Sequence, residues 1–74
     1  MAAYKVRIKL DEILKERGIS DREFARMTGI RHPSVGEMRT NKTQRLPLEN
    51  LAIICEVLDV EITDILELVK EPRD

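Results

Sequence analysis

The stretch that decides the fold is residues 21–40, DREFARMTGIRHPSVGEMRT, which predicts two short helices joined by a tight turn. Ser20 and Glu23 have the spacing of a capping box, so we expect a helix to begin directly after Ser20. Gly29 follows the last residue of that helix, where a left-handed conformation costs little without a Cβ. Pro33 suits the first turn of a second helix, because its missing N–H would have no intrahelical partner there.

Side chains in the two predicted helices are spaced to pack against each other. The first helix places three residues on one face: Phe24, Met27 and Thr28. Ala25 lies where the helices would cross, and a methyl group is about all that such a close approach accommodates. Ile30 turns inward after the first helix, and Val35 and Met38 give the second helix a narrow apolar stripe. The segment is therefore a predicted helix-turn-helix whose second helix keeps a polar, free side.

The rest of the chain predicts three more helices and one strand. Residues 4–9 alternate between apolar and basic side chains, which is typical of a short half-buried strand, and a lone strand needs a partner. Apolar residues at helical spacing predict a helix from Leu10 to Gly18, another from Pro47 to about Leu58, and a last short one with Ile65, Leu66, Leu68 and Val69. Residues 71–74 are charged, and we expect them to fray.

Length and residue types bound the class of protein. At 74 residues, the chain is expected to form a single domain, residues 1–74. One cysteine cannot form an internal disulfide, and Cys55 with His32 cannot build a zinc site, so no metal or other cofactor is expected. An enzyme is not expected either, because no nucleophile–base pair or phosphate-cradling glycine loop is present. With no membrane-spanning run and no signal peptide, the expected location is the cytoplasm.

Charge is distributed unevenly along the chain. Residues 1–45 contain eleven Lys and Arg against six acids, a formal charge of +5, whereas residues 46–74 sum to −6. The formal net charge of −1 therefore conceals a basic half that contains the helix-turn-helix. Because salt screens charge beyond roughly 8 to 10 Å, the local basic surface decides attraction to a polyanion.

Residues 10–68 resemble the phage-repressor-like helix-turn-helix family, the Cro/CI or xenobiotic-response-element class of bacterial and phage transcriptional regulators. Three segments carry the resemblance: KERGISDREFARMTGI, RHPSVGEMRTNKT and LPLENLAIICEVLDVEITDILELV. The resemblance implies an all-α, five-helix lambda-repressor-like DNA-binding domain, here with a short N-terminal β-strand. It also implies sequence-specific binding of double-stranded DNA through a recognition helix in the major groove, and a role as a transcriptional regulator, most simply a repressor.

The candidate DNA contacts are of two kinds. Base readout is expected from the exposed start and middle of the recognition helix: His32, Pro33, Ser34 and Glu37. Phosphate contacts are expected from the flanking polar and basic residues: Ser20, Arg22, Arg31, Asn41, Lys42, Thr43 and Arg45. Each has a plainer interpretation as an ordinary solubilising surface residue, and we expect about a third of the phosphate set to make no contact.

Several positions depart from the family pattern. Asp21 stands where Gln is common and would repel a phosphate, Arg31 replaces the usual Ser or Thr cap, and Asn41 replaces a frequent Gly. Glu61 stands where a Ser often caps the last helix. Gly36 is unusual inside a helix; either the backbone approaches DNA closely there, or the position is exposed and tolerant.

One recognition helix reads about one half-site, so a homodimer is the expected form on DNA. The surfaces expected to join subunits are the strand at Val6–Ile8 and the apolar stretch of residues 65–69; alternatively, the strand packs within its own chain. The alternative function is a protein-interaction module, such as an antitoxin or adaptor that docks through its acidic second half. No small-molecule ligand domain is expected.

Overall fold

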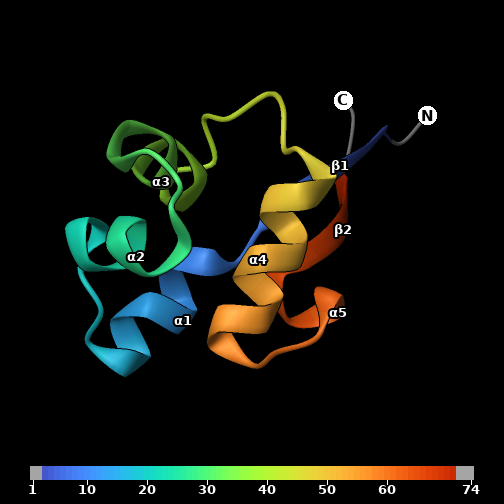
Figure 1. Cartoon of the computed structure of the whole chain (residues 1–74). Coiled ribbons are helices and arrows are strands. Elements are labelled where there is room, and N and C mark those ends of the chain that lie inside the picture. Colours follow the sequence, from blue (N-terminus) through green and yellow to red (C-terminus); the bar gives the residue numbers. More distant parts are fainter. Residues whose placement is uncertain (1–2, 72–74) are drawn as a thin grey trace.

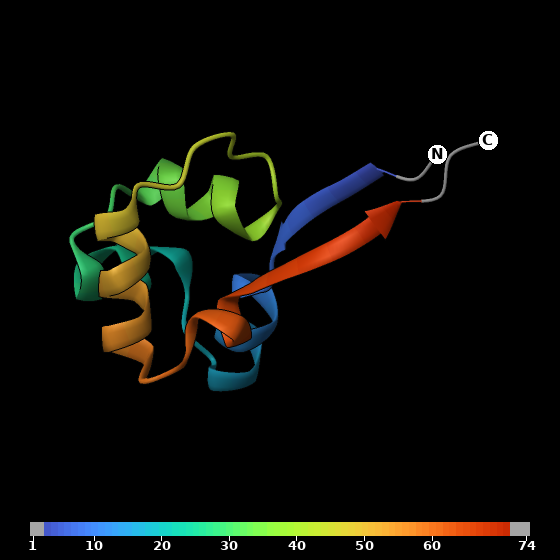
Figure 2. The same cartoon turned by 90° about the vertical axis from the view of Figure 1, so that its right-hand side faces the viewer.

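A computed structural model describes residues 3–71 and contains five helices and two strands in that range (Figure 1). The elements follow in the order β1 (Ala3–Ile8), α1 (Leu10–Arg17), α2 (Asp21–Thr28), α3 (His32–Arg39), α4 (Leu48–Leu58), α5 (Ile62–Ile65) and β2 (Leu66–Glu71). The helices pack into one body, and the two strands extend from it side by side (Figure 2).

Local signals in the sequence set the helix boundaries. The Ser20 hydroxyl accepts a hydrogen bond from the Glu23 N–H at 3.1 Å, which caps the start of α2 as expected. Gly18 and Gly29 end α1 and α2 with φ of 66° and 77°, the left-handed conformation that glycine adopts without strain. Asp59 ends α4 in the same conformation, with φ of 55°.

The core lies between the helices and is made of aliphatic side chains around one aromatic ring. Its fully buried members are Leu10, Leu14, Phe24, Val35, Ile54, Leu58 and Ile65. All five helices contribute to this set, so the helix-turn-helix is held by α1, α4 and α5. Cys55 is half-buried beside the core, as expected of a small apolar residue, and burial raises the pKa of its thiol.

The two strands form an antiparallel pair that we call the arm, residues 3–8 and 66–71. Ala3 lies opposite Glu71, Val6 opposite Leu68 and Ile8 opposite Leu66. The N-terminal strand therefore pairs within its own chain, which was the alternative to pairing between chains. Lys9 connects the arm to the body through its N–H, which donates to the Ile65 carbonyl at 2.7 Å.

The arm corrects four expectations. The fold is not all-α, because a second strand follows α5. Residues 66–69, expected in a last helix, are in β2, and α5 ends at Ile65. The N-terminal strand spans residues 3–8, not 4–9, and Glu71 ends β2, while the rest of the expected frayed tail, 72–74, lies outside the described residues. No helix within residues 3–71 has the length and apolar character needed to cross a membrane.

Candidate nucleic-acid interface

Helices α2 and α3 meet across the turn that the sequence predicts. The Thr28 hydroxyl donates to the Phe24 carbonyl at 2.8 Å and accepts from the Ile30 N–H at 3.1 Å, so it fixes the chain as it leaves α2. Ile30 is buried, and Val35 and Met38 turn the inner side of α3 into the core. These contacts set the orientation of α3, and with it the side that the helix presents to solvent.

The outer side of α3 carries the residues expected to read bases. His32, Pro33 and Glu37 are exposed, whereas Ser34 is half-buried. His32 offers a donor and an acceptor, Pro33 an apolar surface and Glu37 an acceptor, which are groups that match base edges in the major groove. Arg31 takes the capping position of α3 without a side-chain cap, so its guanidinium is left for other contacts.

Four of the expected phosphate contacts are exposed cations around α3. They are Arg22, Arg31, Lys42 and Arg45. Within residues 3–71, none of the four forms an ion pair, although other cations of the chain do. Unpaired cations that flank α3 in the chain are available for phosphate oxygens without first breaking an internal ion pair.

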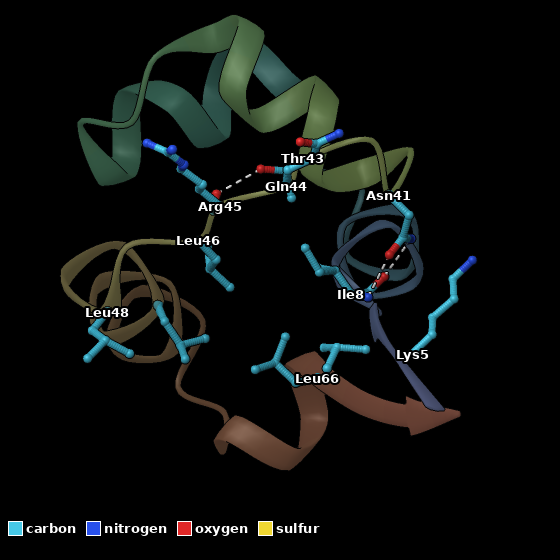
Figure 3. A pocket seen from close by; sticks show the side chains of 11 residues that line it. Lys5, Ile8, Asn41, Thr43, Gln44, Arg45, Leu46, Leu48 and Leu66 are labelled. Atoms are coloured by element: carbon cyan, nitrogen blue, oxygen red, sulfur yellow. Dashed lines mark hydrogen bonds between the residues drawn. The ribbon is translucent and has the colours of Figure 1, made fainter. Parts of the chain in front are cut away.

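Three other residues of the expected phosphate set already have partners. Ser20 caps α2, and the Thr43 hydroxyl donates to the Arg45 carbonyl at 2.8 Å. The Asn41 amide binds both polar backbone groups of Ile8: its Oδ1 accepts from the Ile8 N–H at 2.7 Å, and its Nδ2 donates to the Ile8 carbonyl at 3.0 Å (Figure 3). Asn41 has φ of 59°, so it takes the left-handed conformation expected of a Gly substitute.

Comparison with family models gave a match over residues 9–71, to the Cro/C1-type HTH DNA-binding domain. The matched range contains all five helices and β2, and therefore the whole predicted interface. The chain belongs to this family. Comparison with curated proteins and with solved structures gave no significant match.

Membership of the Cro/C1-type family establishes that the chain is a DNA-binding helix-turn-helix domain. The structure also shows what the residues that depart from the family pattern contact. Asp21 and Arg39 are the clearest case. The Arg39 guanidinium donates to Asp21 Oδ1 through Nη1 and to Asp11 Oδ1 through Nε, the latter at 2.7 Å. Its side chain is only 17% exposed. The Asp21 carboxylate therefore holds the last turn of α3 through an ion pair within the protein.

Sequence reasoning missed this cluster of Asp11, Asp21 and Arg39. It joins α1, α2 and α3, and no local spacing connects positions so far apart in the chain. The hydrogen bond from Arg39, followed by that from Lys15, lowers the pKa of Asp11 from its usual value. The Asp11 carboxylate is consequently charged at neutral pH, which suits an ion pair with the last turn of α3.

Gly36 in this Cro/C1-type domain faces α2. A Cβ at Gly36 would point toward Asp21, with Oδ2 at 3.7 Å, which is an ordinary van der Waals distance. The position is thus half-buried against the protein and has room for a methyl group. Among the described residues, no group of His, Cys, Asp and Glu is arranged to hold a metal ion.

Proposed function

We propose that this Cro/C1-type domain binds double-stranded DNA sequence-specifically through α3 in the major groove and acts as a transcriptional regulator, most simply a repressor in the cytoplasm. One observation carries the proposal: α3 buries Val35 and Met38 while its other side, with His32, Pro33 and Glu37, stays open between unpaired cations. A groove-reading helix needs this combination of a fixed inner face and a free outer one.

The cations would position the domain, and α3 would select the sequence. Arg22 and Arg31 precede the exposed side of α3 in the chain, and Lys42 and Arg45 follow it, so phosphates on both sides of the groove have candidate partners. Glu37 accepts from a cytosine amino group and repels phosphate, so it favours selection over overall affinity. Because one such helix reads one half-site, we propose that two copies bind together.

Selection from a random pool of DNA duplexes tests the proposal. We expect an enriched motif with two inverted half-sites whose centres are about 34 Å apart, or a multiple of that distance. Glu37→Ala in the same selection should relax the preference at one position of each half-site while the bound motif stays recognisable. Failure to enrich any sequence at low salt would contradict DNA binding and favour a protein-interaction module that docks through the exposed acids of α4 and α5.

A further inference from the structure

The arm has one mainly polar face, which also contains Val69, and one mainly apolar face, and both are largely exposed. Because side chains alternate along a strand, Lys5, Arg7 and Glu67 share the first face, where Arg7 pairs with Glu67 at 3.3 Å. The second face carries Tyr4, Val6 and Leu68, which are 62%, 59% and 68% exposed, and Lys70 lies beside Tyr4 at its outer end. We call these three residues the apolar arm face. A strand pair surrounded by water is expected to be polar on both sides, so this asymmetry indicates that one face is covered.

At the base of the arm, the same apolar face continues into a groove. The groove encloses about 360 Å³ and lies between the arm, the loop at residues 40–47 and the start of α4. Its apolar lining is Val6, Ile8, Leu46, Leu48, Leu51 and Leu66. Figure 3 shows Ile8, Leu46 and Leu66 directed into this space, and Leu48, 82% exposed, lies at the start of α4.

The arm thus presents projecting side chains at its end and a recess at its base, on one face. A symmetric pair of chains requires this self-complementarity, because each surface of one copy must meet its counterpart on the other. Two arms packed face to face in opposite directions would bring Tyr4 of each copy over the groove of the other. A dimer of this kind covers Tyr4, Val6, Leu48 and Leu68 of both copies. The total surface that it buries is then on the order of 1,000 Å², the minimum that specific interfaces need.

The alternative of pairing edge to edge is less suited to this arm. Asn41 occupies both polar backbone groups of Ile8, so the outer edge of β1 is already closed at its base. Pairing along the outer edge of β2 would extend the sheet and leave the apolar arm face in water. Packing through the face covers the exposed side chains, and it is the arrangement that the burial pattern favours.

We infer that a second copy of this chain packs on the apolar arm face and inserts its Tyr4 into the groove beside the α3–α4 loop. The role of this dimer in DNA binding rests on the proposed function. The loop that lines the groove also carries Lys42 and Arg45, two of the proposed phosphate contacts. A second copy seated there would supply the second recognition helix that a site of two half-sites requires.

Sedimentation velocity of the full chain without DNA tests the inference. We expect a dimer at tens of micromolar, and Leu68→Lys should weaken dimerisation by at least about tenfold because it places a charge at the centre of a buried contact. Met27→Lys is the matched control: Met27 is 44% exposed on α2, away from the arm (Figure 1), and this variant should dimerise normally. A monomeric wild type, or equal effects of the two substitutions, would overturn the inference.

The single tyrosine of a chain without tryptophan supplies a second readout. Iodide quenching of Tyr4 fluorescence should fall as wild-type protein is concentrated, and should stay constant for Leu68→Lys. Leu68→Lys could also disturb the arm itself, so Val6→Thr, which keeps the β-branched shape, is the milder variant. Its concentration-dependent fall in iodide quenching should lie between those of wild type and Leu68→Lys. A dimer in which Tyr4 remains fully accessible to iodide would contradict insertion into the groove.

The two proposals fail in distinguishable ways. Wild-type protein that binds DNA specifically while Tyr4 stays accessible and the chain monomeric overturns the dimer surface alone. Conversely, a dimer that depends on Leu68 but enriches no DNA sequence overturns the proposed function and leaves the surface intact.

Discussion

Arg39 Nε donates to Asp11 Oδ1 over 2.7 Å, which ties the last turn of α3 to the first turn of α1. The same guanidinium binds Asp21 at the start of α2. Three helices are thereby joined by one half-buried cation. The orientation of α3 therefore depends on this clamp in addition to the apolar contacts of Val35 and Met38.

Replacing Arg39 should destabilise the fold. Arg39→Ala leaves two carboxylates without their partner, and we expect a loss of about 1–3 kcal/mol in the free energy of unfolding, measured by urea denaturation. Arg26→Ala is the control, because Arg26 is exposed on α2 and forms no ion pair within residues 3–71. Equal stability of the two variants would show that the clamp contributes little.

The clamp also predicts a dependence on pH. The pKa of Asp11 is lowered in the folded state, so its charged carboxylate stabilises the fold when the pH is above the ordinary pKa of 3.8. That contribution is lost as the pH falls through the folded pKa, below about 4. Wild type should therefore lose more stability between pH 5 and pH 3 than Asp11→Asn, as followed by urea unfolding at each pH. Parallel curves for the two proteins would contradict the assignment.

Asn41 should matter for the fold through two separable properties. Asn41→Gly keeps the left-handed conformation and removes the amide that binds Ile8, so we expect a loss of about 1–2 kcal/mol for two hydrogen bonds. Asn41→Ala loses the amide and also strains the backbone at φ of 59°, so it should be the less stable of the two. Thermal unfolding of the two variants, followed by circular dichroism, separates the contribution of the hydrogen bonds from that of the backbone conformation. A Gly variant as stable as wild type would show that the hydrogen bonds contribute nothing.

The helix-turn-helix was predictable because its signals are local. Ser20, Gly29 and Pro33 mark the ends of α2 and the start of α3, and each acts through its own backbone geometry within one turn of the chain. The inner residues Val35 and Met38 followed from helical spacing alone. The sequence also singles out the four exposed cations, because they flank the predicted helix, and their contact with phosphates stays a prediction.

The arm and the clamp were not predictable, because both depend on residues distant in the chain. Ile65, Leu66, Leu68 and Val69 form a short apolar run that fits a helix or a strand equally well. Pairing with β1, at the other end of the chain, decides in favour of the strand. Likewise, nothing in the sequence pairs Asp21 with Arg39, and its carboxylate is expected only to favour the N-terminus of its helix and to repel a nearby phosphate.

Gly36→Ala should stabilise the protein and leave DNA binding intact. Alanine favours a helix interior by up to about 1 kcal/mol over glycine, and the space toward Asp21 accommodates the new methyl group. Because this methyl points at α2, we expect unchanged affinity for the selected duplex, measured by fluorescence anisotropy. A more stable variant with weaker affinity would instead show that the α3 backbone itself approaches DNA at Gly36.

The salt dependence of DNA affinity should identify which cations reach phosphates. For a duplex of fixed sequence, the logarithm of the affinity falls linearly with the logarithm of the salt concentration, with a slope of about −0.9 per phosphate contact. Lys42→Ala and Arg45→Ala should each make this slope shallower by about one contact while the preferred sequence stays the same. Lys15→Ala is the control, because Lys15 pairs with Asp11 on α1, and its removal should leave the slope unchanged. A wild-type slope in all three variants would exclude Lys42 and Arg45 from the phosphate contacts and leave Arg22 and Arg31 as the cations to replace next.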